Sequence, residues 1–150
     1  MFPLCSFLVW LIAKRRLRTA HFWHHKGLWA SSACAFCLGA EETTDHLFFQ
    51  CNFTKQLWAQ LGQLLRFKFL CTMWEDMEQL YSLCAGAKGA TRITNAAIIM
   101  LYYIWLERGK RRTGSAVSSV GSIVVRVFGL LKAVGSKWTN GFYLGQASKL

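Results

Sequence analysis

The sequence predicts a mainly α fold: a small helical domain organised around a Cys-Cys-His-Cys zinc knuckle. Apolar residues recur at three- and four-residue steps along most of the chain, which is the spacing of one helix face. Three cysteines and one histidine lie within a single stretch of 18 residues, 34–51. The 150 residues, 53% of them hydrophobic, suit one domain with a substantial core.

We expect this domain to have three parts. Residues 2–66 form the zinc-binding module with its flanking helices, and residues 67–135 form a helical C-terminal part of the same domain. Residues 136–150, with the turn-forming pair Asn140-Gly141, form a loosely ordered tail.

The N-terminal segment predicts two helices. Residues 4–17 are apolar on nearly all sides and therefore predict a buried helix. Thr19 is a suitable N-cap for a short helix through His25, which Gly27 closes. The apolar runs at 1–13 and 96–106 are shorter than a membrane-spanning helix, so we expect no membrane span.

An amphipathic helix is predicted from about residue 53 to 66, with Asn52 as its N-cap and Trp58 in its apolar stripe. We expect Trp58 to lie in the core, over the zinc module. The brief alternation at 66–71 predicts an extended segment.

Residues Thr72 to Glu75 match a capping box, so a helix is expected from Met73 to about Cys84. Gly86 and Gly89 then predict a loop.

A strongly apolar helix is predicted to begin at Thr91 or Thr94 and to end near Arg108, with Gly109 as its stop. Glu107 and Arg108 should form a local charge pair of little energetic weight.

Valines and leucines at helical spacing predict a last helix within residues 115–134. Gly121 and Gly129 lie inside it. Each either weakens the helix by about 1 kcal/mol or lets another backbone approach closely.

The pattern C-x2-C-x8-H-x4-C supplies the four ligands that a tetrahedral zinc ion needs: Cys34, Cys37, His46 and Cys51. The first two can reach one ion from a single turn. Because these four ligands leave no position open for water, the pattern indicates one structural Zn²⁺ per chain and not a catalytic one.

His46 and Cys51 constrain the local geometry. Five residues correspond to roughly 140° around an ideal α-helix. The two side chains can share an ion only if a short helix, capped by Thr43 or Thr44, ends near Gln50 and the chain turns there.

Other interpretations of these side chains remain open. The three cysteines could pack as small apolar residues around a core histidine, and a disulfide framework is less favoured because six cysteines in 150 residues are too few for one. His21, His24 and His25 stand nearby; we expect them to be exposed, with one as an alternative ligand. Cys5, Cys71 and Cys84 are expected to be buried thiols.

The net charge of +11 favours a polyanionic partner. Six of the seven acids lie between residues 41 and 78, and two basic clusters flank them. If folding brings the clusters together, they form a phosphate-binding face; otherwise they are solvated helix ends. The candidate nucleic-acid-binding residues are Lys14, Arg15, Arg16, Arg18 and Lys26 in the first cluster, and Arg108, Lys110, Arg111 and Arg112 in the second.

Three motifs resemble a known family. The run from Glu42 to Cys51 (Glu-Thr-Thr-Asp-His-Leu-Phe-Phe-Gln-Cys), with Cys34-x2-Cys37 before it and Trp58 after it, is similar to the zinc-binding domain C-terminal to the reverse transcriptase of plant non-LTR (LINE-type) retrotransposons. Residues 7–20 resemble that family's approach to its zinc site, and Ile104-Trp-Leu-Glu-Arg108 resembles its I-W-x-E-R-N motif. The resemblance covers roughly residues 2–112.

The resemblance implies a non-catalytic accessory domain that helps a polymerase to hold RNA or target DNA. The sequence itself has no paired carboxylates at catalytic spacing, no Gly-rich phosphate loop and no acidic polymerase motif, so we expect no enzyme. The alternatives are a zinc-ordered helical fragment that binds a polymerase domain or another protein, and the product of a decayed open reading frame without function. Reduced thiols are consistent with an intracellular compartment, the nucleus included.

Overall fold

The computed structural model describes residues 3–84 and 90–134. Within these ranges the chain is helical, apart from loops and one isolated antiparallel bridge between Ala33 and Glu41. The elements are α1 (Pro3–Ala13), α2 (Ala20–His25), the π-helical turn η1 (His46–Gln50), α3 (Asn52–Leu65), α4 (Trp74–Cys84), α5 (Ala90–Thr113) and α6 (Val120–Val134). The mainly α prediction is confirmed.

None of the described helices combines the length and the apolar content that a membrane crossing requires. The loop predicted at Gly86 and Gly89 and the tail predicted at 136–150 lie outside the described residues.

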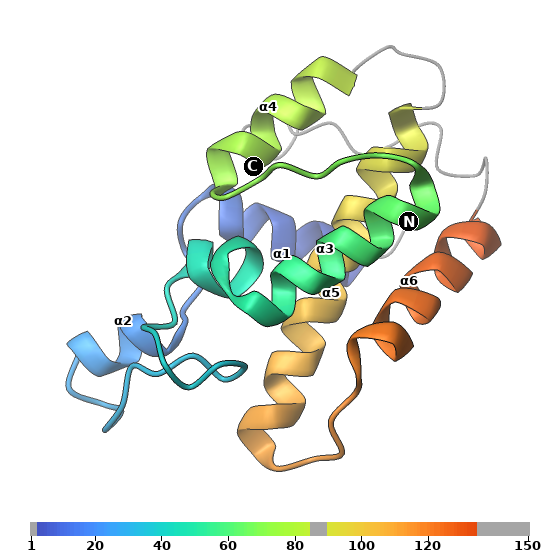
Figure 1. Ribbon diagram of the computed structural model, residues 1–150. Helices are drawn as coiled ribbons and strands as arrows, with labels where there is room; N and C mark the ends of the chain where they lie inside the picture. Colours follow the sequence, from blue (N-terminus) through green and yellow to red (C-terminus); the bar gives the residue numbers. More distant parts are fainter. Residues whose placement is uncertain (1–2, 85–89, 135–150) are drawn as a thin grey trace.

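Helix α5 is the central element of the fold (Figure 1). It contacts α1, α3, α4 and α6, and α3 packs in turn against α6 and η1. Residues 96–101 of α5 are all buried, so this stretch is surrounded by other elements. Helix α2 and residues 31–45, which we call the zinc loop, project from the bundle at the lower left of Figure 1.

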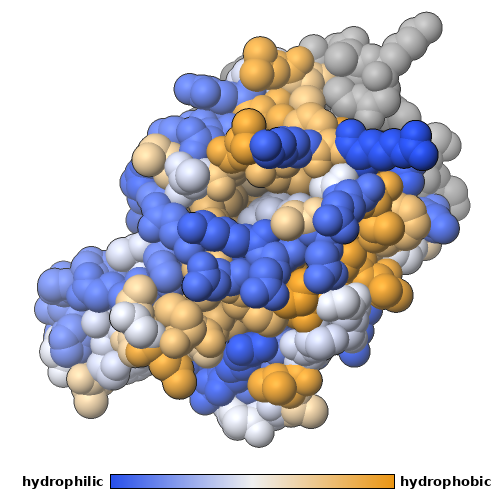
Figure 2. Space-filling view, in the orientation of Figure 1, coloured by the Kyte–Doolittle hydropathy of each residue, from blue (hydrophilic) through white to orange (hydrophobic). Residues whose placement is uncertain are grey.

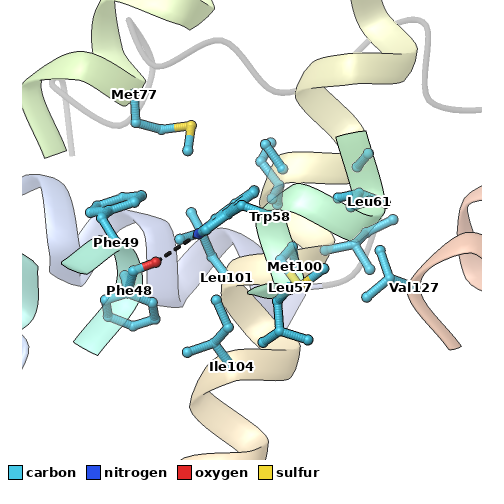
Figure 3. Close-up of a cluster of buried hydrophobic side chains, with 14 of the residues drawn as sticks. Phe48, Phe49, Leu57, Trp58, Leu61, Met77, Met100, Leu101, Ile104 and Val127 are labelled. Atoms are coloured by element: carbon cyan, nitrogen blue, oxygen red, sulfur yellow. Dashed lines mark hydrogen bonds between the residues drawn. The ribbon is translucent and has the colours of Figure 1, made fainter. Parts of the chain in front are cut away.

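Trp58, on α3, contacts Phe48 and Phe49 of η1 inside the hydrophobic core (Figure 3). Its indole is 5% exposed, and its Nε1–H donates a hydrogen bond of 2.7 Å to the carbonyl oxygen of Phe48. Its ring stacks on Phe49 at a centroid distance of 6.1 Å. The prediction that Trp58 lies in the core is confirmed, and the buried indole N–H has the partner that burial requires.

Helix α1 ends four residues before the predicted boundary. Arg15 adopts a left-handed conformation (φ +51°), and the Arg16 amide donates to the Leu11 carbonyl at 2.8 Å. This is a Schellman-type end, which satisfies terminal carbonyl groups and turns the chain towards α2.

Helix α2 spans the predicted residues, and Gly27 (φ +72°) closes it. Thr19 occupies the N-cap position but makes no side-chain capping bond. The Glu42 carboxylate accepts the Ala20 amide instead, at 2.9 Å.

The capping box predicted for α4 is wrong in its partners. Asp76, and not Glu75, reaches back to Thr72, whose amide donates to Asp76 Oδ2 at 2.8 Å. The helix begins at Trp74, whose amide donates to Asp45 Oδ1 at 2.9 Å. The first turn of α4 is therefore capped from the segment that precedes His46, which ties α4 to the metal-binding region.

Helix α5 continues through Gly109 to Thr113, so the stop predicted at Gly109 is wrong. A mid-helix glycine costs only about 1 kcal/mol. The added turn carries Arg111 and Arg112, both of which form ion pairs. Gly114 (φ +72°) ends the helix instead.

Helix α6 begins at Val120, five residues after the start of the predicted range. The Ser118 amide donates to Glu107 Oε1 at 2.8 Å, which holds the preceding segment in a non-helical conformation. Ser119 then caps the helix by accepting the Ser122 amide at 3.2 Å. The space beside Gly121 and Gly129 is open, so these glycines do not admit another backbone.

Gly62 is the glycine that the fold requires for a close approach. A Cβ at this position of α3 would lie 2.4 Å from the carbonyl oxygen of Phe67. Arg66, in a left-handed conformation (φ +52°), folds the chain back at this point, and the Phe67 amide donates to the Gly62 carbonyl at 2.9 Å. The backbone of residues 67–71 therefore packs against α3 without forming a strand.

Gly62→Ala is expected to lower the free energy of unfolding by about 1–3 kcal/mol, because the new methyl group overlaps backbone atoms. Gly129→Ala on α6 is the matched control: its site is open, so it should stabilise the helix by about 0.5–1 kcal/mol. Urea unfolding of both variants measures the difference. Equal effects at the two sites would contradict this packing.

Candidate metal centre

The zinc loop presents Cys34 and Cys37 from one tight turn. The Cys34 amide donates to the Ala40 carbonyl at 2.8 Å, and the Leu38 amide donates to the Cys34 carbonyl at 3.0 Å. Leu38 takes the left-handed conformation (φ +57°) that reverses the chain. The Phe36 amide points at Cys34 Sγ, 3.4 Å away, which is the orientation that favours a thiolate.

His46 and Cys51 come from opposite ends of η1. The Thr43 hydroxyl accepts the His46 amide at 3.1 Å, as predicted for a cap at Thr43 or Thr44. The Cys51 amide donates to the His46 carbonyl at 2.8 Å, five residues back. This π-type bond widens the turn and brings two residues that an α-helix would separate onto one side. The helix ends at Gln50, as the sharing of one ion requires.

Cys51 has an extended conformation (φ −64°, ψ +138°) and is the N-cap of α3. The prediction that Asn52 caps this helix is therefore wrong by one residue. The Cys51 carbonyl accepts the Lys55 amide at 2.9 Å, so the residue that ends η1 also begins α3.

The four predicted ligands come together in space. Their ligand atoms all lie within 4.8 Å of one another. Cys34 Sγ and Cys51 Sγ are 4.0 Å apart, and Cys37 Sγ and His46 Nε2 are 3.4 Å apart. Around a tetrahedral zinc ion, sulfur and nitrogen ligands lie about 3.5–3.8 Å from one another. The side chains present therefore fit a Cys₃His zinc site.

The burial of the ligands is graded. Cys34 and Cys51 are fully buried, His46 is half-buried and Cys37 is exposed. The ion would thus lie at the edge of the core, reached from solvent past Cys37.

The ligands differ in how readily they give up a proton. The neighbouring Cys51 thiol and burial raise the pKa of Cys34, whereas the contact with Cys34 lowers the pKa of Cys51. Burial lowers the pKa of His46, which favours the neutral imidazole that binds metals. Binding of a metal ion would require both buried thiols to lose their protons.

A buried carboxylate, Glu42, supports the zinc loop. It is fully buried, and its Oε1 accepts hydrogen bonds from Arg108 at 3.2 and 2.8 Å. Its Oε2 accepts from Arg112 at 2.8 Å and from the Ala35 amide at 3.0 Å. Burial opposes ionisation, but the two arginines and the Ala20 amide outweigh it and hold the pKa of Glu42 below its ordinary value.

Residues 1–58 match a family described as zinc-binding in reverse transcriptase. The matched stretch contains all four ligands, Glu42 and the first turns of α3. It supports a reverse transcriptase zinc-binding domain in this part of the chain, and its description names zinc binding and not polymerase catalysis. Searches of curated proteins and of solved structures found no significant match.

Glu107 and Arg108 belong to the motif that resembles I-W-x-E-R-N, and they lie outside the matched stretch. Each forms an ion pair in the structure. Arg108 reaches Glu42 in the zinc-binding domain, and Glu107 Oε1 accepts from Arg111 at 3.3 Å. Glu107 is 2% exposed and Arg108 is 9% exposed. The prediction of a local, weak charge pair between these two residues is therefore wrong, because Arg108 pairs with Glu42 and Glu107 pairs with Arg111.

Arg111 contacts an aromatic ring of the zinc loop and one of α3. Its guanidinium carbon is 4.3 Å from the ring centroid of Phe53 and 5.1 Å from that of Phe36. The centroids of these two rings are 4.7 Å apart. Phe36 directly precedes Cys37, and Phe53 follows Cys51 by two residues. The last turn of α5 thus packs on the zinc-binding domain through charge and aromatic contacts.

The predicted basic residues fall into two structural classes. Lys14, Arg15, Arg16, Arg18 and Lys26 are exposed, and Arg15 pairs with Glu75. In the second cluster, Arg108, Arg111 and Arg112 form ion pairs with buried acids, while Lys110 is half-buried. Arg112 lies 5.3 Å from the ring centroid of Trp29, and that ring lies 6.2 Å from the ring of Trp23, over which Arg18 lies at 5.5 Å.

The other candidate ligands and thiols lie apart from the Cys₃His group. His21 and His25 group with Glu41, while His24 Nδ1 lies 3.0 Å from the Trp29 carbonyl. Cys5 is buried as predicted, whereas Cys71 and Cys84 are only half-buried. Sequence reasoning missed Glu42, since nothing in the motif shows that its partners lie more than 60 residues downstream.

Proposed function

We propose that this chain is a non-catalytic domain of a LINE-type retrotransposon reverse transcriptase-like protein, in which one structural Zn²⁺ orders a surface that helps to bind RNA or DNA. The observation that carries the proposal is the Cys₃His group, whose atoms lie within 4.8 Å of one another inside the matched stretch. Four protein ligands fill a tetrahedral zinc site and leave no place for an activated water.

The distribution of acids supports a polyanionic partner. Each of the seven acids has a partner within the protein, and three of them neutralise arginines: Glu42 with Arg108 and Arg112, Glu75 with Arg15, and Glu107 with Arg111. The remaining acids accept hydrogen bonds or face a histidine. The excess positive charge is therefore carried by other cations, among which Arg16, Arg18 and Lys26 are exposed.

Exposed cations of the first cluster lie on aromatic rings. The Arg18 guanidinium is 4.8 Å from the ring centroid of Phe22 and 5.5 Å from that of Trp23. Arg16 lies over Trp10 at 5.7 Å. Cations beside aromatic faces are the combination that holds single-stranded nucleic acid through phosphate contacts and base stacking. The end of the molecule formed by α2 is largely hydrophilic on the face shown in Figure 2.

This contact should be tolerant of sequence and steeply dependent on salt. If Lys14, Arg16, Arg18 and Lys26 each neutralise one phosphate of a single strand, log K should fall against log salt with a slope of about −3, which is about fifty-fold between 50 and 200 mM. Fluorescence anisotropy with mixed-sequence RNA and DNA oligonucleotides measures the slope.

A double variant, Arg16→Gln with Arg18→Gln, should reduce the slope to about −1.4. Arg126→Gln is the matched control, because Arg126 is an exposed cation on α6, away from α2 in Figure 1. Affinity that is independent of salt, or equal losses in the two variants, would contradict the proposed surface.

A second candidate function is the binding of another protein, such as the polymerase domain. The observation that favours it is the exposed apolar side of α1, where Leu4 is 64% and Phe7 56% exposed. Side chains one helical turn apart form a continuous patch. This candidate gains weight if the oligonucleotides fail to bind at low salt.

A further inference from the structure

Three side chains outside the Cys₃His group form a second cluster of metal ligands. His21 and His25 lie four residues apart on α2 and therefore project from the same side of the helix. Glu41 faces them from the end of the zinc loop. Their ligand atoms all lie within 4.8 Å of one another.

The distances suit a small divalent ion. His21 Nδ1 lies 3.3 Å from Glu41 Oε2, and the two imidazole rings are 4.2 Å apart between centroids. Nitrogen and oxygen ligands at about 2.0–2.2 Å from a tetrahedral ion lie about 3.3–3.5 Å from one another. Two imidazoles and one carboxylate form a donor set that suits zinc.

The two atoms that face each other in this cluster, His21 Nδ1 and Glu41 Oε2, form no other hydrogen bond among the described residues. His21 Nδ1 is shielded from solvent and has no hydrogen-bond partner of acceptable geometry among the described residues, although Glu41 lies within reach. Glu41 Oε1 contacts the Ser32 hydroxyl at 3.4 Å, which leaves Oε2 directed at His21. A shielded nitrogen without a partner carries a cost that a bound cation would remove.

The backbone holds the two halves of the cluster together. The His21 amide donates to the Glu42 carbonyl at 3.2 Å, next to Glu41 in the chain. Glu41 is fixed in turn by its bridge to Ala33. His21 and Glu41 are therefore positioned by backbone contacts and not by an ion bound between them.

We propose that His21, His25 and Glu41 bind a second zinc ion, separate from the Cys₃His site, with its fourth position open to solvent. This ion clamps α2 to the zinc loop. With three protein ligands, of which His25 and Glu41 are exposed, it binds more weakly than the structural zinc and exchanges with free zinc.

The test counts zinc on the full chain by native mass spectrometry as free Zn²⁺ is raised. The expected result is one ion that resists a weak chelator and a second that is taken up at higher free zinc. His25→Ala should weaken the second binding about tenfold or more, as losses around a metal site do. His24→Ala is the matched control on the same helix, since His24 Nδ1 faces the Trp29 carbonyl and not the cluster.

A second readout separates the two sites. Co²⁺ bound by thiolates absorbs strongly through charge transfer from sulfur, so this absorption reports only the Cys₃His site. His25→Ala should keep it while losing the second equivalent, which also shows that the variant is folded. A chain that takes up one zinc only, or a second zinc that survives both His25→Ala and Glu41→Gln, would overturn the proposal.

Discussion

Cys51→Ser is expected to abolish zinc binding at the Cys₃His site and to unfold the zinc-binding domain at neutral pH. Structural zinc contributes about 10–16 kcal/mol in small zinc-finger peptides, which is as large as the whole stability of a typical domain, about 5–15 kcal/mol. Cys51 is fully buried, belongs to the Cys₃His group, and is at once the C-cap of η1 and the N-cap of α3. Far-UV circular dichroism with and without a chelator measures the loss of helix.

Cys84→Ser is the control for this prediction. Cys84 is half-buried at the end of α4 and lies outside the ligand group. Its replacement should leave zinc content unchanged and alter stability by less than about 1 kcal/mol. Equal losses of helix in the two variants would mean that thiol burial, and not metal binding, stabilises this part of the chain.

Glu42→Gln is expected to lower the free energy of unfolding by about 3–5 kcal/mol, the usual result when one partner of a buried ion pair is removed. The glutamine amide keeps the size of the side chain but leaves Arg108 and Arg112 without their carboxylate. Urea unfolding of the zinc-loaded chain measures the change. Glu75→Gln is the control, because the pair of Glu75 with Arg15 is at the surface and should contribute about 0–1 kcal/mol.

The effect of Glu42→Gln should depend on pH. Because the pKa of Glu42 is lower in the folded chain than its ordinary value of 4.5, its contribution is complete above that value. It is lost as the pH falls through the lowered folded-state pKa. The difference between wild type and variant should therefore be largest near pH 7 and shrink in acid. A difference that grows in acid would contradict the buried ion pairs.

The parts of the fold that follow from local sequence signals were predictable. The helical spacing of residues 53–66 gave α3 and placed Trp58 in the core, where it now donates to Phe48. The ligand motif also required the chain to turn after Gln50, and it does. These features depend on neighbours within a few residues.

The errors arise where distant residues replace a local partner. Asp45 caps α4 from 29 residues upstream, and Asp76 takes the place of Glu75 as the acid that reaches back to Thr72. Glu42 holds Arg108 and Arg112, which favours continuing α5 through Gly109. The π-type bond that aligns His46 with Cys51 is local, but the spacing of side chains in an α-helix does not predict it.

Native mass spectrometry of wild type and Cys37→Ser, after dialysis against a weak chelator, tests the central claim most directly. Cys37 is the exposed ligand, so serine removes a zinc ligand with little change in the core. We predict one tightly held zinc per wild-type chain and its loss in Cys37→Ser, together with helical signal. A folded wild-type chain without zinc, or a variant that retains the tightly held ion, would contradict a structural Cys₃His site.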